Sequence, residues 1–204
     1  MENNTTFATS RSKYIDKINE IPNPVVKQRI LNNQDQLNDS EIYSVVALGA
    51  AATSIIDLFT PDGAKVVGLR NISNQKLDAE KYFMVNAIEI LYGIDAADSG
   101  YSATFATCPI PDAVFNGELE ITQNGRKIFS KQSMGAFFTG ITASSIAVGP
   151  LTALANGKAI IKLDNPKFLY PQEEIKARME WGHHCGAANS YLKIRLIGTV
   201  NERA

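Results

Sequence analysis

The sequence predicts an all-β fold of the antiparallel sandwich class, preceded by a partly helical N-terminal arm. Short apolar segments recur at the spacing of strands and are separated by turn residues. Several of them alternate charged and apolar residues, which is the period of a strand with one buried face. Helical segments do not alternate with the strands, which argues against an α/β fold. A chain of 204 residues suits one such domain, although two very small domains also fit this length.

Residues 1–40 form the predicted arm and residues 41–204 the predicted sandwich domain. The arm is rich in Asn, Gln, Asp and Lys, and its one apolar periodicity follows Asn23-Pro24, a good N-cap and first residue for a short helix. Because this stripe is thin, we expect the arm to be ordered mainly by contact with another molecule; the alternative is a flexible tail. Deleting residues 1–40 should then leave the sandwich folded and impair assembly. The stripe comprises Val25, Val26, Ile30, Leu31 and Leu37.

The first half of the domain contains four predicted strands: Ile42–Leu48, Ser54–Phe59, Lys65–Leu69 and Tyr82–Tyr92. The second ends at Pro61-Asp62-Gly63, a turn in which Pro presets φ and Gly accepts a positive φ. The fourth is apolar on both faces, as expected of a central strand. A helix is the alternative there, because short apolar segments fit both periods.

The clearest alternation lies between Gly117 and Val200. Asn124-Gly125 separates two strand-like segments and predicts a hairpin, because a type I′ turn needs a positive φ at both central residues. Later strands are predicted over Lys158–Leu163, ending at Asp164-Asn165-Pro166, and then over Glu174–Trp181 and Leu192–Leu196. A slip of one residue in the last two would bury charges, so their register should be well defined. The whole pattern predicts nine to eleven strands.

Charge and composition exclude several classes of protein. Lys plus Arg (20) nearly equals Asp plus Glu (21), which argues against specific nucleic-acid binding; a local basic patch is the alternative. Cys108 and Cys185 belong to no paired motif, so a disulfide framework is not expected. The first residues lack the apolar core of a secretion signal, which favours use in a cytoplasm or release by another route. The charge-free window 132–157 contains Gly and Pro, so no transmembrane segment is expected.

The only histidines, His183 and His184, lie beside Cys185 and just after Trp181. Zinc needs three or four ligands held tetrahedrally, whereas neighbouring residues on a strand point to opposite faces. A turn with two exposed histidines is therefore favoured over a metal site. We nominate no catalytic, cofactor-binding or metal residues and expect no cofactor.

The segment Asp95–Asp98 could form a cation-binding loop, but it lacks the alternating oxygen ligands and distal Glu of an EF-hand, which favours a solvated loop. Glycine-rich phosphate loops are absent from the sequence. An enzyme of the cupin-like class would need a His-Glu-His ligand set that the sequence does not offer. The sequence therefore predicts a protein without catalysis.

Several segments carry a resemblance to a known family. They are Arg70-Asn71-Ile72, the strand Tyr82–Ile88, Gly117–Ile121 with its Asn-Gly turn, Asn165-Pro166 before a strand ending in Trp, and Lys193–Gly198. Over about residues 65–200 the chain resembles the jelly-roll virion (capsid) structural proteins of icosahedral tailless bacteriophages. The resemblance implies an eight-stranded Greek-key sandwich, symmetric oligomers and a structural role in a virion shell. The chain is short for a double jelly roll, so a single jelly roll with an N-terminal arm suits it better.

We therefore expect a self-assembling coat, penton or accessory shell component, located in the virion after assembly in a host cytoplasm. It would form homo-oligomers and contact other virion proteins through the arm and through loops such as 132–157. An ordinary pair of loops covering the core is the alternative for residues 132–157. The alternative function is a carbohydrate- or receptor-binding sandwich module, in which exposed Tyr or Trp181 would line a sheet.

Overall fold

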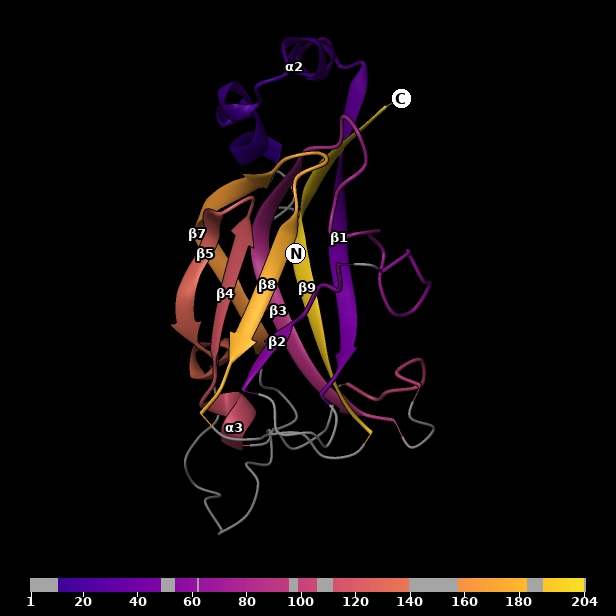
Figure 1. Ribbon diagram of the computed structural model, residues 1–204. Coiled ribbons are helices and arrows are strands. Elements are labelled where there is room, and N and C mark those ends of the chain that lie inside the picture. Colours follow the sequence, from indigo (N-terminus) through magenta and orange to yellow (C-terminus); the bar gives the residue numbers. More distant parts are fainter. Residues whose placement is uncertain are drawn as a thin grey trace, which may run out of the picture.

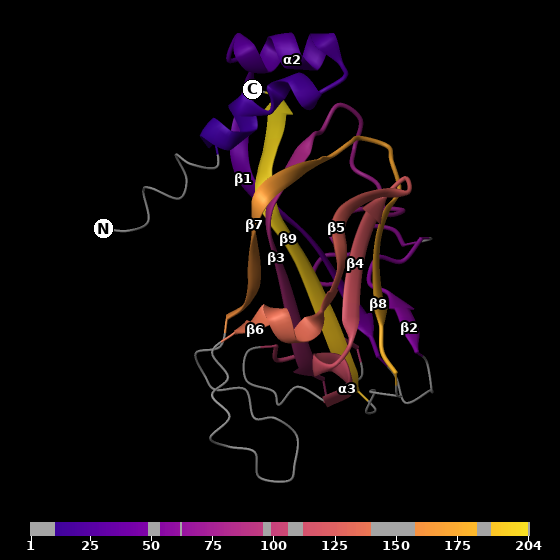
Figure 2. The same ribbon diagram turned by 90° about the vertical axis from the view of Figure 1, so that its left-hand side faces the viewer.

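The structure is a computed structural model; in the residues that it describes, nine strands form two antiparallel sheets that face each other (Figure 1, Figure 2). This confirms the predicted all-β antiparallel sandwich. None of the helices in the described ranges is long and apolar enough to cross a membrane. The structure describes residues 11–48, 54–61, 63–95, 99–105, 112–139, 158–182 and 189–203.

The five-stranded sheet has the order β1-β9-β3-β7-β6, and the four-stranded sheet has the order β2-β8-β4-β5. The strands of the first sheet are β1 (Asp35–Ala47), β3 (Phe83–Ile94), β6 (Phe138–Thr139), β7 (Lys158–Leu169) and β9 (Ser190–Arg203). Those of the second are β2 (Ile55–Asp57), β4 (Glu118–Gln123), β5 (Arg126–Ser133) and β8 (Ile175–Glu180). Two short helices, α3 (Asp112–Phe115) and η2 (Met134–Phe137), lie at one end of the sandwich (Figure 2).

One main core fills the space between the sheets. Alternation places every second side chain of β8 and β9 in it, as the sequence pattern predicts. Each sheet contributes side chains that are fully buried, and burial of such side chains is the main driving force for folding. Among them are Phe83, Val85, Ile88 and Leu192 from the first sheet and Leu119, Ile121, Ile175 and Met179 from the second.

The N-terminal segment 11–31 is helical and packs on the end of its own sheet rather than awaiting another molecule. It contains a helical turn at 11–16, η1 (Ile18–Glu20) and α2 (Pro24–Leu31). Asn23 caps α2 as predicted, accepting hydrogen bonds from the backbone N–H groups of the next two non-proline residues at 3.0 and 3.3 Å. A second apolar cluster joins this segment to the outer face of the first sheet; its members include Tyr14, Ile18, Val26, Ile30, Tyr82, Met84 and Phe168.

This packing changes the predicted boundary at residue 40, which falls inside β1. Deleting residues 1–40 would remove the first part of β1 and uncover Tyr82, Met84 and Phe168, which are buried under the helical segment. The expectation that such a deletion leaves the sandwich folded therefore does not fit the structure. The reason is that the thin stripe at Val26 and Ile30 finds its partners on distant strands.

The hairpin at Asn124-Gly125 is confirmed: both residues have a positive φ, and β4 pairs with β5 around them. The segment at Tyr82–Tyr92 is strand β3, and the helical alternative is wrong. Ser54–Phe59 contains the shorter β2. The predicted window 132–157 begins with the end of β5, η2 and β6, where Met134 and Phe137 are buried in the main core. Residues 140–157 lie outside the described residues.

One strand prediction is wrong, and another places the end of its strand too early. Residues Lys65–Leu69 form a tight turn closed by a bridge between Val66 and Arg70, with Gly68 at a φ of +87°. The strand predicted to end at Asp164-Asn165-Pro166 continues as β7, because those residues bulge out of the ladder. Val85 faces Lys167 whereas Ala87 faces Lys162, so the extra residues of β7 are accommodated in the bulge, where a proline is tolerated.

Candidate functional site

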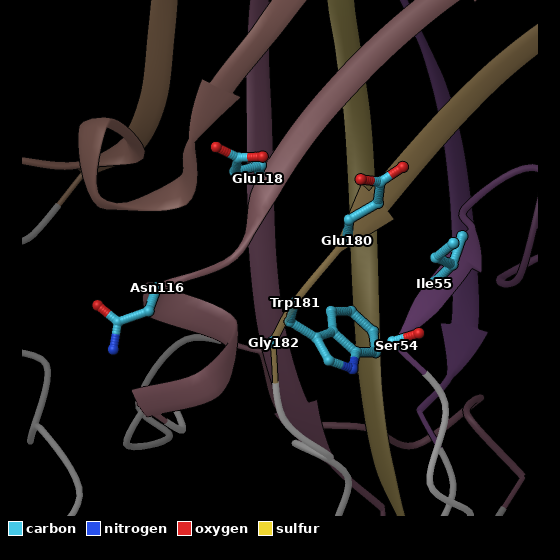
Figure 3. A pocket seen from close by; sticks show the side chains of 7 residues that line it. All are labelled: Ser54, Ile55, Asn116, Glu118, Glu180, Trp181 and Gly182. Atoms are coloured by element: carbon cyan, nitrogen blue, oxygen red, sulfur yellow. The ribbon is translucent and has the colours of Figure 1, made fainter.

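A polar recess of about 350 Å³ lies at the end of the four-stranded sheet, near α3 (Figure 3). Its walls come from the ends of β2, β8 and β4, which are neighbouring strands of the four-stranded sheet, and from the residue that follows α3. Two carboxylates, an amide and a hydroxyl face it or border it. The lining residues are Ser54, Ile55, Asn116, Glu118, Glu180, Trp181 and Gly182.

Glu118 and Glu180 stand directly opposite each other on β4 and β8. Like charges in this position destabilise a sheet unless a cation lies between them. The ammonium group of Lys131, on the neighbouring strand β5, supplies that cation. Its Nζ lies 3.1 Å from a carboxylate oxygen of Glu118 and 2.5 Å from one of Glu180.

The hydrogen bond from Lys131 holds the pKa of the Glu180 carboxyl below its ordinary value. Hydrogen bonds to Glu180 and Glu118 in turn raise the pKa of Lys131. Glu180 is therefore a carboxylate at neutral pH and an acceptor of hydrogen bonds. The recess is suited to binding hydroxyl or amine donors.

Replacing Lys131 by methionine is expected to lower the thermal midpoint at pH 7 more than at pH 4. In the natural protein the lowered pKa of Glu180 gives stability that is present above the ordinary glutamate pKa and is lost as the pH falls through the lowered one. In the variant the facing carboxylates repel each other at pH 7, and protonation relieves the repulsion.

Scanning calorimetry at the two pH values measures this difference. Lys127→Met is the matched control, because Lys127 belongs to the same strand and pairs only with the single carboxylate of Glu120, at 3.1 Å, among the described ion pairs. An equal loss of stability at both pH values in the Lys131 variant would contradict the bridging role.

Trp181 is a core residue and not an exposed binding platform. Only 5% of it is exposed, and it belongs to the main apolar core. Its backbone N–H donates to the carbonyl oxygen of Ser54 at 2.9 Å, which continues the pairing of β2 with β8. The prediction of an exposed tryptophan is wrong because Trp181 follows the same alternation as Ile175 and Met179, whose side chains point inward.

Asp95 is buried, with 3% exposed, so the exposed position expected for it is wrong. Its carboxylate accepts hydrogen bonds from the Ser99 hydroxyl at 2.8 Å and the Ser102 hydroxyl at 2.7 Å. These bonds give the carboxylate a role in holding the loop. Asp98 lies outside the described residues.

The other sequence-predicted candidates, His183, His184, Cys185 and Cys108, also lie outside the part of the chain that the structure describes. Within the described ranges, no three His, Cys, Asp or Glu residues are grouped so that they could hold a metal ion.

No family model and no curated protein matches this chain. The interpretation of the recess therefore depends on its own geometry.

The sequence reasoning missed the group of Glu118, Lys131 and Glu180. Glu118 and Glu180 lie on the wet faces of segments with visible alternation, so their exposure was predictable, whereas the segment around Lys131 does not alternate. Their proximity was not, because β4 and β8 are separated by more than fifty positions and their register is set by tertiary packing. An acidic residue at the end of each of two strands was the only available signal.

Proposed function

We propose that this chain is a non-catalytic structural subunit of a bacteriophage virion, a coat, penton or accessory shell component built as a single jelly roll. It would assemble with copies of itself and with other virion proteins and be located in the virion. The N-terminal segment 1–40 and loops such as 132–157 would make these contacts. The observation that carries the proposal is the order in which the strands pair.

With β6 left aside, the first strand pairs with the last, the second with the one before it, the third with β7 and the fourth with β5. These pairs fall alternately into the two sheets. A chain folded back on itself as one long hairpin and then rolled up gives this order. It corresponds to the two Greek keys of a jelly roll, an architecture that recurs in viral capsids, lectins and cupins.

Among these three classes, the exposed apolar side chains favour the assembling one. Large apolar residues that remain exposed on the helical segment are Ile15 (36%), Val25 (60%) and Leu31 (51%). The opposite side of the segment is already occupied by the second apolar cluster. An apolar surface that its own fold leaves uncovered is typical of a site of protein association.

A carbohydrate-binding module is the second candidate, and the recess favours it. Glu118 and Glu180 offer the acceptors that sugar hydroxyls require, and Asn116 also lines the recess, with its amide turned away from the two carboxylates (Figure 3). The buried position of Trp181 removes the aromatic platform that this candidate expected.

Size-exclusion chromatography with light scattering, followed by electron microscopy of the same sample, tests the first proposal. We expect rings, shells or defined oligomers whose formation is weakened by Val25→Ser together with Leu31→Ser, whereas circular dichroism should be unchanged because both side chains are exposed. A stable monomer at high concentration would count against the structural role. Binding of the monomer to a glycan array that Glu180→Gln abolishes would favour the second candidate instead.

A further inference from the structure

We propose that the uncovered edge of β1 at Asp35–Asp39, together with the lysine-bearing pocket beside it, binds an extended segment of a partner protein that carries an acidic side chain. The partner segment would add a strand to the five-stranded sheet. This inference deepens the proposed function and rests on it for the biological identity of the partner, another component of the same assembly.

The two sheets have four edges, and β1 differs from the other three. The edge strands β2 and β6 are only 3 and 2 residues long. β5 is longer, but its pairing with β4 is interrupted by register shifts and it carries the exposed Lys127 and Lys131. Short length, bulges and lysines are the devices by which proteins prevent an edge from accepting another strand. The described strands β2, β5 and β6 are thus protected.

β1 has none of these devices. It is 13 residues long and contains no Lys, Arg or Pro, and its pairing with β9 runs without a register shift from Asp35 to Ala47. In Figure 1 it runs along one side of the molecule, with the loop that follows β2 beside its middle. A long, regular edge of this kind is a template for an added strand.

The chain itself covers the later part of this edge, from Glu41 to Val45. The Asn71 side chain acts like a short piece of strand: its Oδ1 accepts from the Tyr43 N–H at 2.8 Å and its Nδ2 donates to the Glu41 carbonyl oxygen at 2.6 Å. The Val45 N–H donates to the carbonyl oxygen of Leu69 at 2.7 Å. The outward-facing backbone groups are therefore those of the odd-numbered residues.

By the same alternation, the N–H and C=O groups of Leu37 and Asp39 face away from β9. No hydrogen bond within the described residues satisfies them, and Asp39 is exposed. The earlier part of the edge, at Leu37 and Asp39, thus offers two donors and two acceptors at the spacing that an antiparallel or parallel guest strand requires.

A pocket of about 240 Å³ opens beside this edge. β1 contributes Ser40, Glu41 and Ile42 to it, and the loop between β2 and β3 contributes Lys65, Lys76 and Lys81. Every second side chain of a strand added along Asp35–Asp39 would point to the side of the sheet on which Ser40 and this pocket lie.

The charges in the pocket define the chemistry of such a side chain. Glu41 is bound to Arg195 at 2.5 Å, and Lys81 is bound to Asp78 at 3.2 Å. No ion pair forms at Lys65 or Lys76 within the described residues, and both are exposed. Glu202 also lines the pocket; it forms no ion pair among the described residues and accepts a hydrogen bond from the Asn38 amide at 2.9 Å. Lys65 and Lys76 are therefore the groups that would pair with a carboxylate on the guest strand. Backbone bonds would supply general affinity, and this carboxylate would supply specificity.

Fluorescence anisotropy with three labelled peptides tests the charge preference. The peptides are nine residues long, alternate Thr and Val, and carry Glu, Gln or Lys in place of the central Thr. The Glu peptide should bind at least about tenfold more tightly than the Lys peptide. Lys65→Glu together with Lys76→Glu should reverse this order. Absence of binding by all three peptides, or an order that the double variant leaves unchanged, would overturn the proposal.

Amide hydrogen exchange on the full chain tests the position independently of any variant. Addition of the Glu peptide should protect the amides of Leu37 and Asp39, while the amides of Asn38 and Ser40, which face β9, should change little. Protection confined to another edge would refute the assignment.

Asp39→Pro should abolish peptide binding because it removes one outward N–H without touching the pairing with β9. Asp39→Asn is its matched control and should bind like the natural protein. An oligomer that forms while no peptide binds would refute this surface and leave the structural role intact, whereas a monomer that binds the Glu peptide would do the reverse.

Discussion

Replacing Gly198 by alanine is expected to lower the free energy of unfolding by about 3 kcal/mol. Gly198 lies on β9, directly opposite Val85 of β3, at the point where the register between these two strands shifts. A Cβ atom there would overlap the carbonyl oxygen of Met84 and lie 2.9 Å from a ring carbon of Phe83. The obstacle is backbone, so relief requires β3, the central strand of its sheet, to move away from β9.

Urea unfolding followed by tryptophan fluorescence measures the change, because Trp181 is in the core. Gly182→Ala is the matched control: a Cβ at Gly182 meets nothing within 4 Å, so its effect should stay within about 0.5 kcal/mol. Alanine has the higher intrinsic preference for a strand, so propensity alone predicts a gain at Gly198. An unchanged or higher stability of Gly198→Ala would show that the contact with Met84 is not limiting.

Replacing Asp35 by alanine is expected to lower the free energy of unfolding by about 3 kcal/mol and to loosen the helical segment 11–31. The carboxylate of Asp35 is 1% exposed. It accepts from Arg29 of α2 at 3.0 Å and from the amide of Asn201 at 2.9 Å. Its removal leaves a half-buried guanidinium with Glu80 as its remaining partner, at 2.9 Å, among the described ion pairs. The hydrogen bonds by which the Asp35 carboxylate joins α2, β1 and β9 are then lost.

Thermal unfolding and limited proteolysis across residues 32–34 measure the two effects. Asp39→Ala is the control on the same strand, because Asp39 is exposed and belongs to none of these contacts within the described residues. Its effect should remain within about 0.5 kcal/mol. Equal effects of the two substitutions, or unchanged proteolysis in Asp35→Ala, would show that the apolar cluster alone holds the helical segment.

The features that were predicted correctly depend on residues close together in the sequence. Asn124-Gly125 specifies its hairpin because only such residues readily accept two successive positive φ values. Asn23-Pro24 specifies the start of α2 because the cap and the first turn that it caps lie within a few consecutive residues. The alternation of β8 reports which face is buried, whichever strand lies beside it.

The predictions that failed depended on distant residues. The turn at Lys65–Leu69 has the apolar content of a strand, but it lies against Tyr43 and Asn71, which β1 positions. Pro166 marks a strand end in most sequences, whereas here a bulge against β3 carries the strand past it. Trp181 was expected at the surface only as the platform of a carbohydrate-binding module, whereas it continues the inward alternation of Ile175 and Met179 and is buried in the main core.

The sequence by itself determined the strand content, the turns and the inward-facing side of most strands, because period and turn chemistry are local properties of the chain. Only the tertiary structure decided that β1 pairs with β9 and that the edge at Leu37 and Asp39 is left open. It also decided that Glu118 lies opposite Glu180 and that Lys131 binds both carboxylates. These outcomes depend on which distant segments together bury the most apolar surface. No short stretch of residues contains that information.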